Sequence, residues 1–240
     1  MTVATGLLAV EARDIGRRFG RTTALRGVNL DVAPGERLAI FGPNGSGKTT
    51  LLRVLAGLTR PTKGSVSIGG LDYRRHELEL RRRVGVVAHH PYLYEDLTAE
   101  ENLQFYGRMF GVEQPKRRVD EVLDMVGMER RRRDRVRTLS RGMQQRLALA
   151  RAVIHDPDVL LLDEPDTGLD QEAVAQMGDL FLKGGGSRTV LLATHDLRVG
   201  MQSCARFAIL VNGRIVHEGQ QADQSLSDLE ELYRSHASAY

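Results

Sequence analysis

Three kinds of feature are scarce in this sequence of 240 residues, and each scarcity excludes a class of protein. No apolar run approaches the roughly 20 residues that a membrane-spanning helix requires, so the sequence predicts no span. The single cysteine, Cys204, has no second cysteine to pair with, which predicts a reducing, intracellular environment rather than a disulfide-stabilised secreted domain. The first residues also lack the basic region that opens a signal peptide.

Lysine is rare too, because only four of the 34 basic residues are lysine. The arginines include a cluster that runs from Arg130 to Arg133 and continues at Arg135 and Arg137. Such a cluster could bind an anionic partner, such as nucleic acid or lipid headgroups. Glu129 and Asp134 interrupt it, however, so we expect an ordinary solvated surface.

The residues that are present indicate one α/β domain. Hydrophobic residues make up 41% of the chain and charged residues 27%, which permits a sizeable core and argues against disorder. Apolar runs bounded by turn residues predict strands, and apolar residues three or four apart predict helices. The expected strands are 7–15, 23–32, 36–41, 65–68, 84–88, 158–162, 189–193, 207–211 and 214–218. The expected helices are 50–58, one opened by a Thr98–Glu101 capping box, one around 119–126, 142–154, and a C-terminal one opened by a Ser227–Glu230 capping box. This order predicts an α/β core with an inserted block of helices.

A glycine-rich segment follows the strand expected at 36–41 and precedes a helix. Residues 42–49, GPNGSGKT, match the phosphate-binding pattern GxxxxGK[ST] in the context that the pattern requires. Its glycines let successive backbone N–H groups point at phosphate oxygens, and the helix adds its positive end. We expect Lys48 to reach the β- and γ-phosphates and Thr49 to contact Mg²⁺. The predicted nucleotide-binding residues are Gly42, Pro43, Asn44, Gly45, Ser46, Gly47, Lys48, Thr49 and Thr50.

The apolar strand that starts at Val159 ends in two adjacent carboxylates, Asp163 and Glu164. Asp163, at the strand end, is suited to hold the Mg²⁺ shell. Glu164, one residue further on, is placed to polarise a water molecule for in-line attack. After a phosphate-binding loop, this pattern predicts a nucleoside triphosphatase.

The segment 139–145, LSRGMQQ, resembles the signature loop of ABC ATPases, usually written LSGGQ. In that family two subunits pair head to tail, and the resemblance implies that Ser140, Arg141, Gly142, Met143 and Gln144 contact the ATP held by the partner subunit. A hydroxyl, a backbone N–H and a helix N-terminus suit an anion. Arg141 departs from the usual glycine, and it either adds charge near the phosphate or, as we favour, points to solvent.

Further positions of the same family fall in order along the chain. Residues 167–170 resemble the loop that crosses the dimer interface, including Asp170, and His195 resembles the switch histidine that contacts the γ-phosphate. Phe19 stands where the family stacks an aromatic ring on adenine, although a core phenylalanine would fit as well. Where the family usually has glutamine this chain has His89, or His90 if the alignment slips by one. Unlike glutamine, an imidazole can titrate.

The resemblance implies the ABC ATPase fold over nearly the whole chain. That fold is α/β: a P-loop (RecA-like) core with an N-terminal antiparallel β subdomain and an inserted α-helical subdomain. We therefore expect one nucleotide-binding domain, 1–240, with its helical subdomain at 91–155. ATP and Mg²⁺ would be its ligands, Glu164 and His195 its catalytic residues, and Thr49, His89 and Asp163 its metal contacts.

The partners implied are a second ATPase subunit in an ATP-dependent dimer and the transmembrane permease subunits of a transporter. The chain itself would lie peripherally on the cytoplasmic side of the inner or plasma membrane. Exposed apolar residues, such as Tyr92, Leu93 or Tyr94, would form the docking patch. The run 89–103 together with LSRGMQQR resembles the haem-exporter ATPase of the bacterial cytochrome c maturation system. A multidrug or polysaccharide exporter is the alternative. A DNA-associated ABC ATPase is disfavoured, because the helical block is short and carries no sustained heptads.

Overall fold

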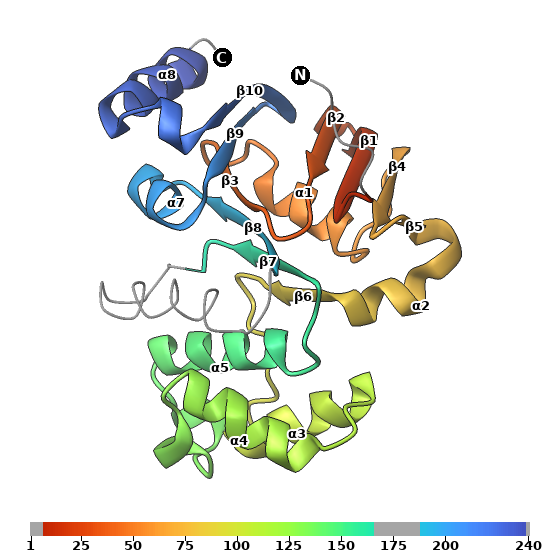
Figure 1. The fold of residues 1–240 in the computed structure, drawn as a ribbon, viewed down its shortest axis with the longest axis vertical. Coiled ribbons are helices and arrows are strands. Elements are labelled where there is room, and N and C mark those ends of the chain that lie inside the picture. Colours follow the sequence, from red (N-terminus) through yellow and green to blue (C-terminus); the bar gives the residue numbers. More distant parts are fainter. Residues whose placement is uncertain (1–6, 166–187, 239–240) are drawn as a thin grey trace.

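The computed structural model describes residues 7–165 and 188–238, whose strands form two sheets (Figure 1). The antiparallel sheet has the order β2-β1-β4-β5 and consists of β1 (Val10–Phe19), β2 (Thr22–Val32), β4 (Lys63–Ile68) and β5 (Leu71–Asp72). The larger sheet has the order β10-β9-β3-β8-β7-β6 and consists of β3 (Arg37–Phe41), β6 (Val84–Val87), β7 (Val159–Asp163), β8 (Thr189–Thr194), β9 (Arg206–Val211) and β10 (Arg214–Gln220). Its strands are parallel except for β10, which returns beside β9 through the Asn212–Gly213 turn.

Helices cover both faces of the larger sheet. They are α1 (Lys48–Leu55), α2 (Tyr73–Arg83), α3 (Ala99–Phe110), α4 (Pro115–Met125), α5 (Arg141–Val153), α7 (Leu197–Ser203) and α8 (Leu226–Ser238), with 3₁₀ turns at Glu129–Arg131, Val136–Thr138 and Gln221–Asp223. In Figure 1 the helices α3, α4 and α5 gather at one end of the molecule, beyond β6, while the antiparallel sheet lies beside α1. No helix of the described ranges is both long and apolar enough to cross a bilayer.

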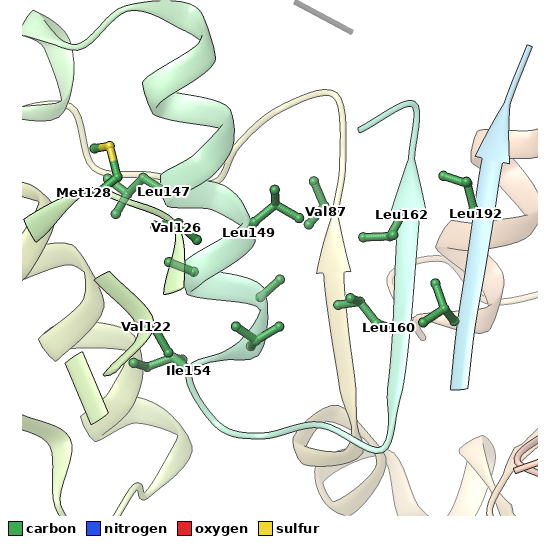
Figure 2. Close-up of a cluster of buried hydrophobic side chains, with 14 of the residues drawn as sticks. Val87, Val122, Val126, Met128, Leu147, Leu149, Ile154, Leu160, Leu162 and Leu192 are labelled. Carbon is green, nitrogen blue, oxygen red and sulfur yellow. The ribbon is translucent and has the colours of Figure 1, made fainter. Parts of the chain in front are cut away.

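The core follows from the alternation of side chains across each strand. In β3, Leu38 and Ile40 join a buried cluster with α1 and the antiparallel sheet. Ala39 and Phe41 face the other way and join a second cluster with the helical block. Figure 2 shows this second cluster, in which Leu149 of α5 lies beside Val87 of β6 and Leu147 lies beside Met128. Helix α5 is therefore packed between the sheet and the other helices.

The expected strands are all present, but one expected helix cap was wrong and two helices were not expected. The C-terminal cap is formed by Ser225 and Asp228, not by Ser227 and Glu230: Asp228 N–H donates to Ser225 Oγ at 3.2 Å, and Ser225 N–H donates to Asp228 Oδ2 at 3.0 Å. The short helix α7 was not foreseen, and neither was helix α2. Only Leu80 of its residues is buried, and His76 breaks its backbone geometry, so it carries no apolar period. The Thr98–Glu101 capping box is present as expected.

Three of the six arginines in the cluster form ion pairs with nearby acidic residues. Arg132 donates to Glu100 at 3.0 Å and to Asp120 at 2.8 Å, and this contact with Arg132 lowers the pKa of Glu100. Arg131 pairs with Asp134 and Arg137 with Asp96, each at 3.1 Å. The cluster therefore ties one surface loop to α3, which agrees with the expectation of an ordinary solvated surface.

His155, just after α5, is a largely but not fully buried histidine of this fold. Its ring stacks on Phe110 with ring centroids 4.0 Å apart, and its Nε2 lies 3.3 Å from the carbonyl oxygen of Val84. Burial lowers the pKa of His155 from its ordinary value of 6.5 to about 4. The folded protein therefore holds this imidazole neutral.

We expect the protein to lose stability as the pH falls from about 6.5 towards 4. In this window the unfolded chain binds a proton at His155 that the folded chain does not bind, so protonation favours unfolding, by up to about 3 kcal/mol. Urea unfolding between pH 4.5 and 7.5 measures the effect. His155→Phe should keep the stacking on Phe110 and show a shallower pH dependence, whereas the exposed-site variant His76→Gln should follow the wild type. Coincident profiles for wild type and His155→Phe would contradict the assignment.

Candidate functional site

The glycine-rich loop lies between β3 and α1, and its backbone conformation leaves the start of α1 open. Gly47 precedes the helix with φ 110°, and no side chain caps the first N–H groups. A Cβ atom at Gly47 would lie 2.7 Å from the carbonyl oxygen of Ala24, so only glycine fits there. Uncapped N–H groups at a helix N-terminus are donors for an anion. Of the other predicted residues, Gly42 and Ser46 are buried, Asn44, Gly45 and Thr49 are exposed, and Pro43 and Thr50 are partly buried.

The loop is supported by the hairpin near the other end of the chain. Gly213 N–H donates to the carbonyl oxygen of Ser46 at 2.8 Å, and Arg26 N–H donates to the carbonyl oxygen of Gly213 at 2.8 Å. A Cβ atom at Gly42 would lie 2.3 Å from the carbonyl oxygen of Leu210. The sequence marked Asn212–Gly213 as a turn, but nothing in the sequence connected that turn with the phosphate loop.

Lys48 is buried and lies inside the loop. Its ammonium donates to the carbonyl oxygen of Gly42 at 2.6 Å and to that of Pro43 at 3.4 Å. The same nitrogen lies 3.6 Å from Glu164 Oε1. The positive charge thus joins the phosphate loop to the end of β7.

Asp163 and Glu164 stand at the carboxyl end of β7, next to the loop. Asp163 is buried, and its Oδ1 accepts a hydrogen bond of 3.1 Å from Thr49 Oγ1. Burial raises the pKa of Asp163, while the Thr49 hydroxyl acts in the opposite direction. Glu164 has the left-handed φ of 48°, and its N–H donates to the carbonyl oxygen of Ala193 at 2.8 Å. A strained backbone that neighbouring strands hold in place fixes the direction of this carboxylate.

The histidine that follows β8 reaches the same carboxylate. His195 Nδ1 lies 3.5 Å from Glu164 Oε1, so one oxygen of Glu164 lies near both Lys48 and His195. His89 follows β6, which pairs in parallel with β7, so His89 and Asp163 lie at the same edge of the sheet. Its exposed ring lies 6.2 Å from that of His90, measured between centroids. The structure therefore brings together side chains from four separate segments of the chain.

The residues around Thr49 and Asp163 fit a magnesium ion. A hydroxyl and a carboxylate are the oxygen ligands that Mg²⁺ prefers, and substrate phosphates usually complete its shell. A cation would also stabilise the charged form of Asp163, which burial disfavours. Within residues 7–165 and 188–238, no group of three or more histidine, cysteine or acidic side chains forms a self-sufficient metal site. The ion would thus arrive with the nucleotide.

The signature residues lie at the start of α5. Ser140 caps the helix and accepts a hydrogen bond of 3.3 Å from Met143 N–H, and Arg141 is exposed. The Gln144 amide donates to the carbonyl oxygens of Val136 and Leu139, each at 3.2 Å. In the part of the chain that the structure describes, no hydrogen bond or ion pair joins residues 139–144 to the phosphate loop. This separation is compatible with contact to a second subunit's nucleotide.

Two further expectations concern Phe19 and the loop at 167–170. Phe19 ends β1 as an exposed ring, which excludes the interpretation as a core residue. The Arg17 guanidinium lies 4.4 Å from the centre of that ring. Asp170 and the loop at 167–170 lie outside the described residues.

Known proteins share these features along most of the chain. The family described as ABC transporter matches residues 25–167. The Nod factor export ATP-binding protein I of Paraburkholderia xenovorans is 39% identical over 217 residues, which are 88% of this chain and 70% of the relative. A daunorubicin resistance ATP-binding protein of Streptomyces coeruleorubidus is 41% identical over 207 residues, which are 85% of this chain and 65% of the relative.

Solved structures of the same kind superpose on this fold. A dimeric ATP-binding cassette in a post-hydrolysis state, bound to ADP and Pi, is 30% identical with a TM-score of 0.79 and covers 88% of this chain and 98% of its own. An ATP-binding subunit of an ABC transporter is also 30% identical, with a TM-score of 0.83, and covers 95% and 98%. The expected ABC ATPase fold is thereby confirmed. The chain belongs to the ABC transporter family and is an ABC-type ATP hydrolase.

Proposed function

We propose that this chain is the ATP-hydrolysing subunit of an ABC exporter and that it energises a membrane partner. The observation that supports this role most strongly is the position of Glu164. Its Oε1 lies 3.6 Å from Lys48 Nζ and 3.5 Å from His195 Nδ1, beside the loop that would hold the phosphates. A carboxylate held between two donors at the γ-phosphate position is suited to accept the proton of an attacking water molecule.

Each neighbour of Glu164 has a part in this proposal. Lys48 binds the β- and γ-phosphates together with the N–H groups of the loop, and His195 orients the attacked phosphate. Thr49 and Asp163 would hold the magnesium ion, and His89 would be a further contact to it. When bound, Mg²⁺ neutralises the charge that develops on the phosphate oxygens. Phe19 supplies a stacking surface for the adenine ring.

We propose further that two such subunits pair head to tail. The signature residues 140–144 then complete the partner's nucleotide site, which accounts for their distance from the subunit's own loop. The helical subdomain, 91–155, receives the permease on the cytoplasmic side of the membrane. Tyr92 and Tyr94 are 43% and 49% exposed and are candidates for the docking patch, whereas Leu93 packs against the core.

The cargo belongs to the multidrug or saccharide class rather than being haem. The relatives named above are a Nod factor export protein and a daunorubicin resistance protein, and they favour the alternative that the sequence left open. The resemblance of residues 89–103 to the haem exporter concerns a segment beside the ATP site. Cargo contacts in such a transporter lie on the permease, so this segment carries little information about cargo.

Co-purification from membranes tests the proposal. We expect the tagged chain to retain a transmembrane permease, and we expect ATPase activity of the complex to rise with an amphipathic drug such as daunorubicin and not with haem. The ATPase activity of the detergent-solubilised complex without added drug or haem is the baseline. Retention of nucleic acid without a permease would contradict the transport role. Stimulation of the ATPase activity by haem and not by the drug would favour haem as the cargo.

A further inference from the structure

The segment that carries His89 is fastened to the helical block at three points. Arg151 of α5 donates from its guanidinium to the carbonyl oxygen of Val86, at the end of β6. Tyr106 of α3 donates from its hydroxyl to the carbonyl oxygen of Tyr92 at 2.5 Å. Asn102 of α3 bonds both backbone groups of Tyr94, accepting from its N–H at 2.8 Å and donating to its carbonyl oxygen at 3.0 Å.

Between these points the segment is exposed and strained. His89 and His90 are both exposed. Tyr92 has a φ of 51°, a left-handed conformation that an aromatic residue rarely adopts. Such a conformation persists only where surrounding contacts impose it. The position of His89 is therefore set by its anchors rather than by its own packing.

Arg151 is an unusual anchor because its charge is buried. The side chain is 8% exposed, its Nε has no hydrogen-bond partner, and its guanidinium lies 5.5 Å from the ring centre of Tyr92 and 5.4 Å from that of Tyr106. No carboxylate in the ranges 7–165 and 188–238 forms an ion pair with it, and burial lowers its pKa. Burying a charge costs free energy unless it is compensated, and no carboxylate of the described ranges compensates this one. The hydrogen bond of Arg151 to Val86 fixes the backbone at the start of the His89 segment.

Helix α5 also links Arg151 to the signature residues. The helix starts beside Ser140, in the signature, and Arg151 lies on its last turn. A helix advances about 1.5 Å per residue, so one rigid rod of roughly 15 Å joins the signature to the His89 segment.

We propose that Arg151, assisted by Tyr106, is a positioning residue that holds the segment of His89 beside the Thr49–Asp163 site and thereby couples this segment to ATP hydrolysis. The proposal rests on the proposed function for its link to ATP hydrolysis. The clamp itself is a separate claim about the segment 86–94. The two claims are tested by different measurements.

Hydrogen exchange of the backbone amides in 86–94 tests the clamp. Arg151→Met keeps the size of the side chain and removes its donors, so exchange in this segment should rise by about tenfold or more. Arg151→Lys keeps one donor for Val86 and should recover part of the protection. The matched control is Arg118→Met: Arg118 donates to the carbonyl oxygens of Val153 and Ile154 at the same end of α5, on the side of α4, so 86–94 should exchange as in wild type.

Steady-state kinetics test the coupling. Arg151→Met should lower kcat by roughly 10- to 100-fold, as expected for a displaced site residue, while KM for ATP changes little because the phosphate loop is untouched. If Arg151 acts through His89, the double variant Arg151→Met/His89→Ala should have the same kcat as the single variant His89→Ala. If the substitution at Arg151 prevents folding, Tyr106→Phe removes only the bond to Tyr92 and should raise exchange at 92–94.

If residues 86–94 exchange as slowly in both Arg151→Met and Tyr106→Phe as in the wild type, the clamp does not exist. Additive losses of kcat in the Arg151 and His89 variants would overturn the coupling. An inactive wild-type protein would instead refute the proposed function, and the exchange measurement would still decide whether the clamp exists.

Discussion

Glu164→Gln is expected to bind MgATP and to hydrolyse it roughly 10²- to 10⁴-fold more slowly than the wild type, the factor attributed to a positioned general base. The amide has the same shape as the carboxylate, so contacts around Lys48 and His195 keep their spacing, but it cannot accept a proton from water. Since hydrolysis would normally separate the paired subunits, this variant should accumulate as an ATP-bound dimer.

Single-turnover hydrolysis and size-exclusion chromatography with MgATP measure these two effects. Glu113→Gln, a substitution of an exposed glutamate in the loop before α4, is the matched control and should behave as wild type. Turnover of Glu164→Gln within a few-fold of normal would show that another group accepts the proton.

Lys48→Ala is expected to weaken MgATP binding by about 10- to 100-fold or more. Hydrogen bonds to charged groups contribute about 1.5–3 kcal/mol each, and the lysine ammonium would make such bonds to two phosphates. The substitution also removes the donor that holds the carbonyl oxygens of Gly42 and Pro43, so the empty loop loses order. Both effects act in the same direction.

Isothermal titration calorimetry with MgATP measures the loss, and thermal unfolding without nucleotide separates folding from binding. Lys63→Ala is the matched control, because Lys63 is exposed and pairs with Asp14 at 2.5 Å on the antiparallel sheet. If Lys48→Ala binds MgATP as tightly as the control does, Lys48 does not contact the phosphates.

The parts of the fold that the sequence predicted are those with a local signal. The strands β7 and β8 are continuous apolar runs, and the capping box at Thr98 opens α3 with two reciprocal hydrogen bonds. Helix α2 was missed because its exposed Arg and Glu residues give no apolar period. The cap at Ser225 was missed because two overlapping Ser-x-x-acid patterns are equivalent in sequence, and only packing selects one of them.

The site shows the same division between local and distant contacts. The phosphate loop and the pair Asp163–Glu164 are contiguous motifs, and the structure places them side by side. The role of Arg151 could not be predicted, because the sequence does not distinguish a buried arginine in a helix from an exposed one. Its role depends on Val86, Tyr92 and Tyr106, which lie far from it along the chain.

The hairpin that supports the phosphate loop has a consequence for the order of folding. The carbonyl oxygen of Ser46 is held by Gly213, and Gly42 packs under Leu210, so the loop acquires its shape only when β9 and β10 have joined the sheet. Contacts so distant in sequence form late, because a long segment must be closed before they contribute. A growing chain therefore carries the complete phosphate-binding motif long before it can bind ATP. Competence for ATP is gained in the last stage of synthesis, when nearly the whole cassette has been made.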